Sequence, residues 1–266
     1  VPCVAWAKTK SRARTLSSSD SDPVPGRRSE QNVMTHSLFP ALVSLLAAVA
    51  AAGVRSETDV PSPPADTLVR YVSDHEIRVG NVLMDISALT VSAPGWVNQK
   101  TGLVEYLAVT SEGKRHESVL VLDVQPLHLQ TALLLFGLDF GQNLAFQGDS
   151  VPPRGDSVDI SVAWLGPEGD SVVVPASELL FDYHDSVVAP TTPWVFTGSM
   201  IHLDRLQADL EGSIIATYSD PVAILNNPAS ARSDDTFYGV NEALVPPPGT
   251  PVVLIITVPL RTGEDK

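Results

Sequence analysis

The clearest structural signal in this chain is Ser157-Val-Asp-Ile-Ser-Val-Ala-Trp-Leu165, followed by Gly166-Pro-Glu-Gly169 and Ser171-Val-Val-Val-Pro175. The first segment alternates apolar with polar or small side chains, as a strand with one buried and one exposed face does. The glycine and proline residues that follow are typical of a tight turn. Together the segments predict an antiparallel hairpin in a mainly β protein.

Short β-branched segments separated by turn residues continue this pattern on both sides of the hairpin. We expect further strands at residues 67–72, 77–82, 88–91, 103–110, 116–123, 194–201, 213–217 and 251–258. The strands 103–110 and 116–123 are predicted to form a second hairpin. The strand 251–258 is apolar on both faces, so we place it at the centre of a sheet.

One helix is predicted over about residues 126–137. Pro126 suits the first helical position, and Gly137 suits the left-handed position after the end. The residues between them leave almost no polar face, so we expect most sides of the helix to be covered. The predicted fold class is α+β, mainly β: an antiparallel sheet or sandwich with this one apolar helix packed on it.

Charge and cysteine content exclude several classes of protein. Six of the 17 basic and three of the 31 acidic residues lie within the first 52, so the remaining 11 basic and 28 acidic residues carry a net charge of −17. Nucleic acids and anionic membrane surfaces are therefore not expected as partners. The one cysteine, Cys3, excludes an intramolecular disulfide and a thiolate cluster. We predict no cofactor.

The amino-terminal part resembles an export signal. Residues 38–52 are uncharged, apolar and end in small residues, which predicts a signal peptide over 34–52 with cleavage after Ala52. The apolar run is shorter than the roughly 20 residues of a membrane span. Residues 1–33 are interpreted as an upstream extension or a long basic region. We expect an exported protein, periplasmic or extracellular, without a membrane span once the signal is removed; the alternative is an uncleaved anchor.

Several long segments resemble the YdjY-domain family of exported bacterial proteins. They are Gly102-Leu-Val-Glu-Tyr-Leu-Ala-Val109, His116-Glu-Ser-Val-Leu-Val-Leu-Asp-Val-Gln-Pro-Leu-His-Leu-Gln-Thr-Ala-Leu-Leu-Leu-Phe-Gly-Leu138, Trp194-Val-Phe-Thr-Gly-Ser199, Glu211-Gly-Ser-Ile-Ile-Ala-Thr-Tyr-Ser-Asp-Pro221 and Pro246-Pro-Pro-Gly-Thr-Pro-Val252. The resemblance covers about residues 75–260 and implies no catalytic residues. The expected organisation is a Pro-rich linker at 53–66, one YdjY-like domain at 67–260 and a polar tail at 261–266.

The candidate catalytic residues are Glu105, His116 and Glu117, on the two strands expected to form the second hairpin. Facing side chains on such strands lie roughly 5 Å apart, so a carboxylate and an imidazole could meet there. A neighbouring carboxylate raises the pKa of a histidine and suits it to act as a general base. The alternative is a structural ion pair between the strands, with His116 and Glu117 on opposite faces.

A weak candidate metal site is formed by Asp182, His184 and Asp185. Two carboxylates and an imidazole could bind a divalent cation, but their spacing matches no established site. The alternative is a solvated loop.

The candidate binding residues lie in the segment 194–242, which includes a long connection after residue 218. They are Trp194, Ser199, Asp220, Asn226, Asn227, Asp234 and Tyr238. Long loops are often functional, and amides, carboxylates and aromatic rings suit a sugar or a peptide. The alternative is an ordered excursion in which Asp220 and Asn226 cap turns and Trp194 fills the core.

None of the familiar catalytic signatures occurs, neither H-E-x-x-H, G-x-S-x-G, a phosphate-binding glycine loop nor an EF-hand. The leading hypothesis is an exported, non-enzymatic binding or accessory domain of the cell envelope, with an unknown ligand or protein as partner. The alternatives are a hydrolase-like enzyme using Glu105 and His116, and a calcium-stabilised extracellular module.

Overall fold

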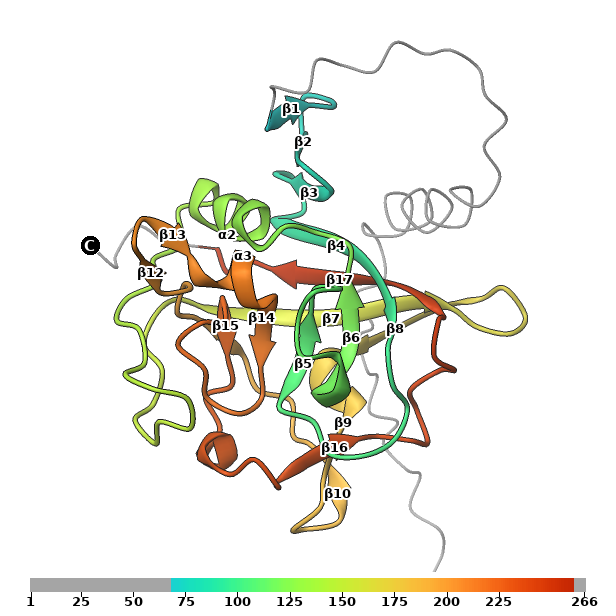
Figure 1. Ribbon diagram of the computed structural model, residues 1–266. Coiled ribbons are helices and arrows are strands. Elements are labelled where there is room, and N and C mark those ends of the chain that lie inside the picture. Colours follow the sequence, from blue (N-terminus) through green and yellow to red (C-terminus); the bar gives the residue numbers. More distant parts are fainter. Residues whose placement is uncertain (1–67, 261–266) are drawn as a thin grey trace, which may run out of the picture. The chain divides into compact units, whose positions relative to one another are not determined.

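The computed structural model describes residues 68–260 (Figure 1), so the expected signal peptide, its cleavage after Ala52, the linker and the tail lie outside the described residues. Twelve strands of the described part join in one sheet. They are β1 (Val69–Tyr71), β2 (Glu76–Val79), β3 (Val82–Asp85), β4 (Thr90–Val97), β5 (Tyr106–Val109), β6 (Ser118–Leu122), β7 (Ser157–Leu165), β8 (Ser171–Pro175), β11 (Trp194–Phe196), β14 (Ser213–Ala216), β15 (Leu225–Asn226) and β17 (Pro251–Thr257).

Eight of these strands close into a barrel. The circuit runs β4-β17-β7-β11-β15-β14-β5-β6, and β6 pairs back onto β4. The strands β1, β2 and β3 continue from one edge of β4, and β8 pairs with β7. The prediction of a mainly β protein is confirmed, but the expected antiparallel sheet or sandwich is wrong, because β6 pairs back onto β4 and closes a barrel.

Closure depends on β4, which exchanges partners along one edge. Its first half, Thr90–Ser92, pairs with β3, and its second half, Gly95–Val97, pairs with β6. At the change of partner lies Gly95, where a Cβ atom would stand 2.3 Å from the carbonyl oxygen of Val121 on β6. Only glycine allows the two backbones to approach this closely.

The strand β17 lies between β4 and β7, as its apolar sequence predicts. Val252, Leu254 and Ile256 are buried in the main core. On its opposite face, Val253 and Ile255 pack with Ala163 of β7 in a separate apolar cluster. Both faces are therefore covered, which confirms the central position.

One predicted hairpin is confirmed and the other is wrong. The strands β7 and β8 pair antiparallel, and a turn joins Gly166 to Asp170 through backbone hydrogen bonds. By contrast, β5 and β6 run parallel, with Tyr106 beside Ser118. The connection between them turns back at Gly113 and ends in a 3-10 helix, η1 (Arg115–Glu117), so the chain returns to the start of β5 before β6 begins.

The predicted helix is α2 (Pro126–Leu135), with Pro126 in its first turn. Gly137 adopts the left-handed conformation, and the amides of Gly137 and Leu138 bond back to Leu134 and Leu133 in a Schellman motif. The helix packs on β2, β3, β4 and a short helix, α3 (Gln207–Glu211), beside it (Figure 1). Leu129 and Leu133 are fully buried, but Leu135 is 55% exposed, so the helix is covered on one face only and the expectation that most of its sides are covered is wrong.

The remaining elements are short. A second sheet contains β10 (Val187–Val188), β9 (Leu180–Asp182) and β16 (Tyr238–Val240); β12 (Ile201–His202) pairs with β13 (Arg205–Leu206); and two 3-10 helices are η2 (Ala176–Leu179) and η3 (Ser230–Ser233). The connection after residue 218 therefore contains β15, η3 and β16. Within residues 68–260, no helix combines the length and the apolar character needed to cross a membrane.

Candidate functional site

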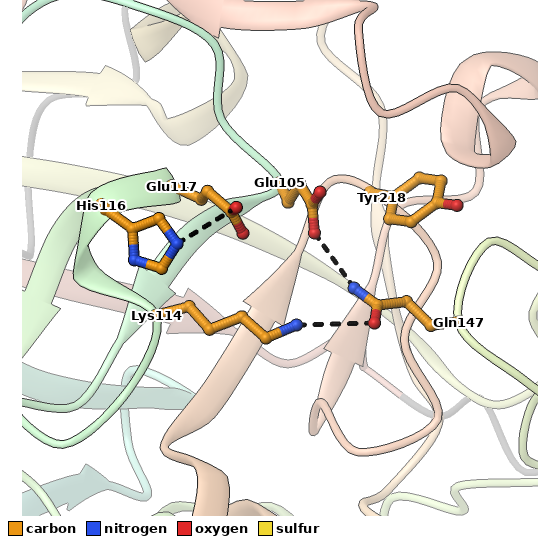
Figure 2. A pocket seen from close by; sticks show the side chains of 6 residues that line it. All are labelled: Glu105, Lys114, His116, Glu117, Gln147 and Tyr218. Carbon is orange, nitrogen blue, oxygen red and sulfur yellow. Dashed lines mark hydrogen bonds and ion pairs between the residues drawn. The ribbon is translucent and has the colours of Figure 1, made fainter.

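A pocket of about 320 Å³ opens beside the first residues of β5 and β6. Three segments supply its lining (Figure 2): the chain around β5 and η1, the connection between α2 and β7, and the end of β14. The lining side chains are Glu105, Lys114, His116, Glu117, Gln147 and Tyr218. All six have a polar group, so the pocket suits a polar ligand.

The backbone of Glu105 joins the segments that form the pocket wall. Its N–H donates to the carbonyl oxygen of Glu117 over 3.0 Å, which holds η1 beside the start of β5. Its carbonyl oxygen accepts from the amides of Thr217 and Tyr218, at 2.8 and 3.0 Å. Glu105, Glu117 and Tyr218 are therefore positioned by main-chain bonds rather than by a flexible loop.

The side chains form two groups of contacts across the pocket. Nε2 of His116 lies 3.2 Å from Oε1 of Glu117. Nε2 of Gln147 donates to Oε2 of Glu105 over 3.0 Å, and the ammonium group of Lys114 donates to Oε1 of Gln147 over 3.4 Å (Figure 2). Gln147 therefore separates the Lys114 cation from the Glu105 carboxylate while contacting both.

The electrostatic environment raises the pKa of the Glu105 carboxyl above its ordinary value. Partial burial is the largest cause, and the negative charge of Glu117 is the next. The Lys114 charge opposes the shift, while Asp235 and a hydrogen bond between the two glutamate side chains add to it. Glu105 therefore keeps a proton to higher pH than an exposed glutamate, which suits proton transfer or the binding of a cation in place of that proton.

Tyr218 forms the aromatic part of the wall. Burial raises the pKa of its hydroxyl, and the negative charges of Asp235, Glu105 and Asp234 raise it further. Its phenol therefore stays neutral at physiological pH, and its ring lines the pocket while its hydroxyl points away from Glu105 and lies against Gly148 (Figure 2).

Beneath the pocket, a chain of hydrogen bonds leads into the core. The ammonium group of Lys114 donates to the hydroxyl of Tyr106 over 3.2 Å, and that hydroxyl donates to Oδ2 of Asp220 over 2.9 Å. Asn226 donates to the backbone carbonyl of Asp220 and to the hydroxyl of Thr197, each over 2.9 Å. Burial, followed by the Asp220 charge, raises the pKa of Tyr106, so its hydroxyl keeps its proton. Lys114 is thus anchored from below.

The structure brings together Glu105, His116 and Glu117, but not in the way the sequence predicted. His116 and Glu117 belong to the 3-10 helix η1 and not to a strand, so they do not lie on opposite faces and their side chains contact each other. Sequence reasoning missed Lys114, Gln147 and Tyr218. The spacing of Gln147 from the other lining residues carries no signal, because only the tertiary fold places its loop beside β5.

The candidate binding residues of the segment 194–242 are mostly buried. Trp194 is 3% exposed and lies in the main core, so its ring offers no stacking surface. Ser199 accepts the amide of Ala208, and Tyr238 is buried in β16.

The polar members of that set hold the loops together, as the alternative interpretation expected. Asp220 accepts the amide of Val222, and the side-chain oxygen of Asn226 accepts the amide of Asp220. Asn227 accepts the amide of Ala229, and Asp234 accepts the amide and hydroxyl of Thr236.

The weak metal candidates form a turn. Oδ1 of Asp182 accepts the amides of His184 and Asp185, at 2.8 and 3.0 Å. Nε2 of His184 lies 3.7 Å from Oδ2 of Asp234. In the described part of the chain, no three histidine, cysteine, aspartate or glutamate side chains gather in a group that could hold a metal ion.

Comparison with known proteins identifies the family. A search of curated proteins and a search of solved structures gave no match to this chain. The model of the YdjY domain matches residues 82–257, which run from the start of β3 to the end of β17 and include the whole barrel and all six pocket residues. The match covers the barrel together with its pocket, and the chain belongs to the YdjY-domain family.

Proposed function

We propose that this YdjY domain is an exported binding or accessory domain of the cell envelope, and that its ligand site is the pocket beside β5. The observation that carries the proposal is the convergence of six polar side chains, from three separate segments, on one open pocket of about 320 Å³. Small-molecule sites commonly have volumes of roughly 300–1,000 Å³. The apolar stretch 38–52 supports the export part of the proposal.

The pocket replaces the segment 194–242 as the proposed contact surface. In that segment the aromatic ring of Trp194 and the amides of Asn226 and Asn227 are buried and occupied by the fold itself. In the pocket, by contrast, Glu105, Lys114 and Tyr218 are only partly buried and retain faces toward the opening. A ligand therefore finds free hydrogen-bonding groups in the pocket.

A nuclear magnetic resonance titration of the full chain tests the binding proposal. The probes are simple sugars, amino acids, short amines and short carboxylates. We expect at least one class to shift the amide signals of Glu105, Lys114, Gln147 and Tyr218, and the variant Tyr218→Ala to weaken that response. Tyr71→Ala serves as the control, because Tyr71 is exposed and outside the pocket. Shifts confined to other surfaces, or none at all, would contradict the proposal.

A hydrolase-like enzyme is the second candidate, and the raised pKa of Glu105 beside Glu117 favours it. A carboxyl group that retains its proton suits general acid catalysis, and its partner carboxylate suits general base catalysis. Chromogenic esters, glycosides and phosphate esters separate this candidate from simple binding. Turnover by the wild-type protein that is lost in Glu105→Gln would establish catalysis, and absence of turnover with retained binding would exclude it for these substrate classes.

A further inference from the structure

We infer that the pocket takes a small ligand bearing a primary ammonium group, held between the carboxyl groups of Glu105 and Glu117. This inference rests on the proposed binding function and names the chemical class of the ligand. It is carried by the pairing of the two carboxyl groups, by the positions of the nearby cations and by the aromatic wall at Tyr218.

The two carboxyl groups are held together by the fold. The main-chain bond from Glu105 to Glu117 places the residues side by side just before the paired parallel strands, and both side chains line the pocket. Two neighbouring carboxylates repel each other unless a proton or a cation lies between them. The pair is therefore a site that a bound cation would stabilise.

The protein's own cations leave this site open. Lys114 points to the Tyr106 hydroxyl and the Gln147 amide, and its ammonium group lies 5.4 Å from the centre of the Tyr106 ring. Within residues 68–260, no lysine or arginine forms an ion pair with Glu105. His116 lines the same pocket and lies 3.2 Å from Oε1 of Glu117, with a side chain that is 76% exposed. Asp235 adds further negative charge around Glu105.

The donor requirements favour a primary ammonium over a metal ion or a quaternary amine. A primary ammonium has three N–H donors and can therefore donate to Glu105 and to Glu117, which both line the pocket. A quaternary amine lacks such donors. The His116 imidazole contacts Glu117, but in the described residues no three histidine, cysteine, aspartate or glutamate side chains form a group that could hold a metal ion.

Lys114 restricts the rest of the ligand. Its positive charge disfavours a second cationic group in the same pocket, while its position beside Gln147 favours a neutral or anionic remainder. The expected ligand class is therefore a molecule with one ammonium group, such as an amino sugar or an amino acid, rather than a polyamine.

Three probes of matched shape test the inference on the full chain: n-butylamine, n-butanol and butyltrimethylammonium. At pH 7 we expect n-butylamine alone to shift the amide signals of Glu105, Glu117 and Tyr218. Equal responses to n-butanol or to butyltrimethylammonium would overturn the requirement for a primary ammonium. If only neutral or anionic probes shift the pocket signals, the binding proposal stands and this inference fails.

Two variants and a change of pH complete the test. Glu105→Gln keeps the size of the side chain and removes its charge, so n-butylamine should bind at least about tenfold more weakly. Glu112→Gln is the control, because Glu112 is exposed in the same connection and does not line the pocket. Affinity should also fall at pH 4.5, the ordinary pKa of a glutamate, because protons then compete with the ligand for the Glu105 carboxylate. The charged groups that act on Glu105 are Glu117, Lys114 and Asp235. Unchanged affinity in Glu105→Gln overturns the inference.

Discussion

Tyr106 donates its phenolic hydrogen to Asp220 over 2.9 Å, although 114 residues separate them in the chain. Both side chains are buried, and the bond joins the first residue of β5 to the segment that follows β14. Since the same hydroxyl accepts from Lys114, this one contact links the pocket floor to the core.

Removing the Tyr106 hydroxyl should destabilise the fold. Tyr106→Phe leaves the buried Asp220 carboxylate with one hydrogen-bond donor fewer, which costs about 1–3 kcal/mol. Urea unfolding followed by circular dichroism measures the loss. The control is Tyr71→Phe, because the Tyr71 side chain is 78% exposed and should change stability little. Equal stability of the two variants would show that the bond contributes nothing.

Replacing Glu105 should change how stability depends on pH. Because burial and the Glu117 charge raise the pKa of Glu105 in the folded state, the folded protein binds this proton more tightly than the unfolded chain does. Glu105 therefore destabilises the wild-type fold progressively as the pH rises above 4.5, the ordinary value. Glu105→Gln should have the higher melting temperature at pH 7, and the difference should disappear at more acidic pH.

Melting curves recorded from acidic to neutral pH follow this difference. Glu112→Gln removes a charge from the same exposed connection without touching the pocket, and it corrects for the general effect of net charge. A difference in melting temperature between wild type and Glu105→Gln that grows toward acidic pH would contradict this prediction.

Substituting Gly95 should disturb the closure of the barrel. In Gly95→Ala the new Cβ atom would meet the Val121 carbonyl oxygen, a backbone atom that cannot move aside without displacing β6. We expect a loss of about 1–3 kcal/mol in the free energy of unfolding. Gly166→Ala is the matched control, because the nearest atoms there belong to the Asp170 side chain, which can rotate away.

Substituting Gly137 tests the end of α2. Its φ of 81° is left-handed, and no atom lies within 4 Å of the position of a Cβ, so Gly137→Ala introduces conformational strain without a clash. The expected loss is about 1–2 kcal/mol, measured by urea unfolding. Gly137→Asn should recover part of this loss, since asparagine tolerates the left-handed region. Identical losses in both variants would contradict this explanation.

Sequence patterns alone predicted the elements whose signals are local. The alternation in residues 157–165 and the turn after it predict the β7–β8 hairpin. Pro126 and Gly137 predict the two ends of α2 closely. The continuous apolar run near the carboxyl terminus places β17 at the centre of the sheet. Each signal depends on the side-chain period or the backbone conformation of a few neighbouring residues, so it does not depend on the rest of the fold.

The site was predicted only in part, for a related reason. Glu105, His116 and Glu117 lie close enough in sequence for a turn to bring them together, although the turn leads into parallel strands and not a hairpin. Gln147 and Tyr218 reach the same pocket from distant segments, and Trp194 turned out to be core. The residues next to Gln147, Tyr218 and Trp194 in the sequence do not indicate which distant segments these side chains contact.

The sequence by itself therefore determined the strand periods, the helix ends, the family and the proximity of Glu105, His116 and Glu117, because period, turn chemistry and motif depend on neighbouring residues. The tertiary structure alone decided that β4 pairs with β6, that one face of α2 remains exposed and that Lys114, Gln147 and Tyr218 complete the pocket. Those outcomes depend on which distant backbones exchange hydrogen bonds, and hydrogen-bonding groups are the same in every strand.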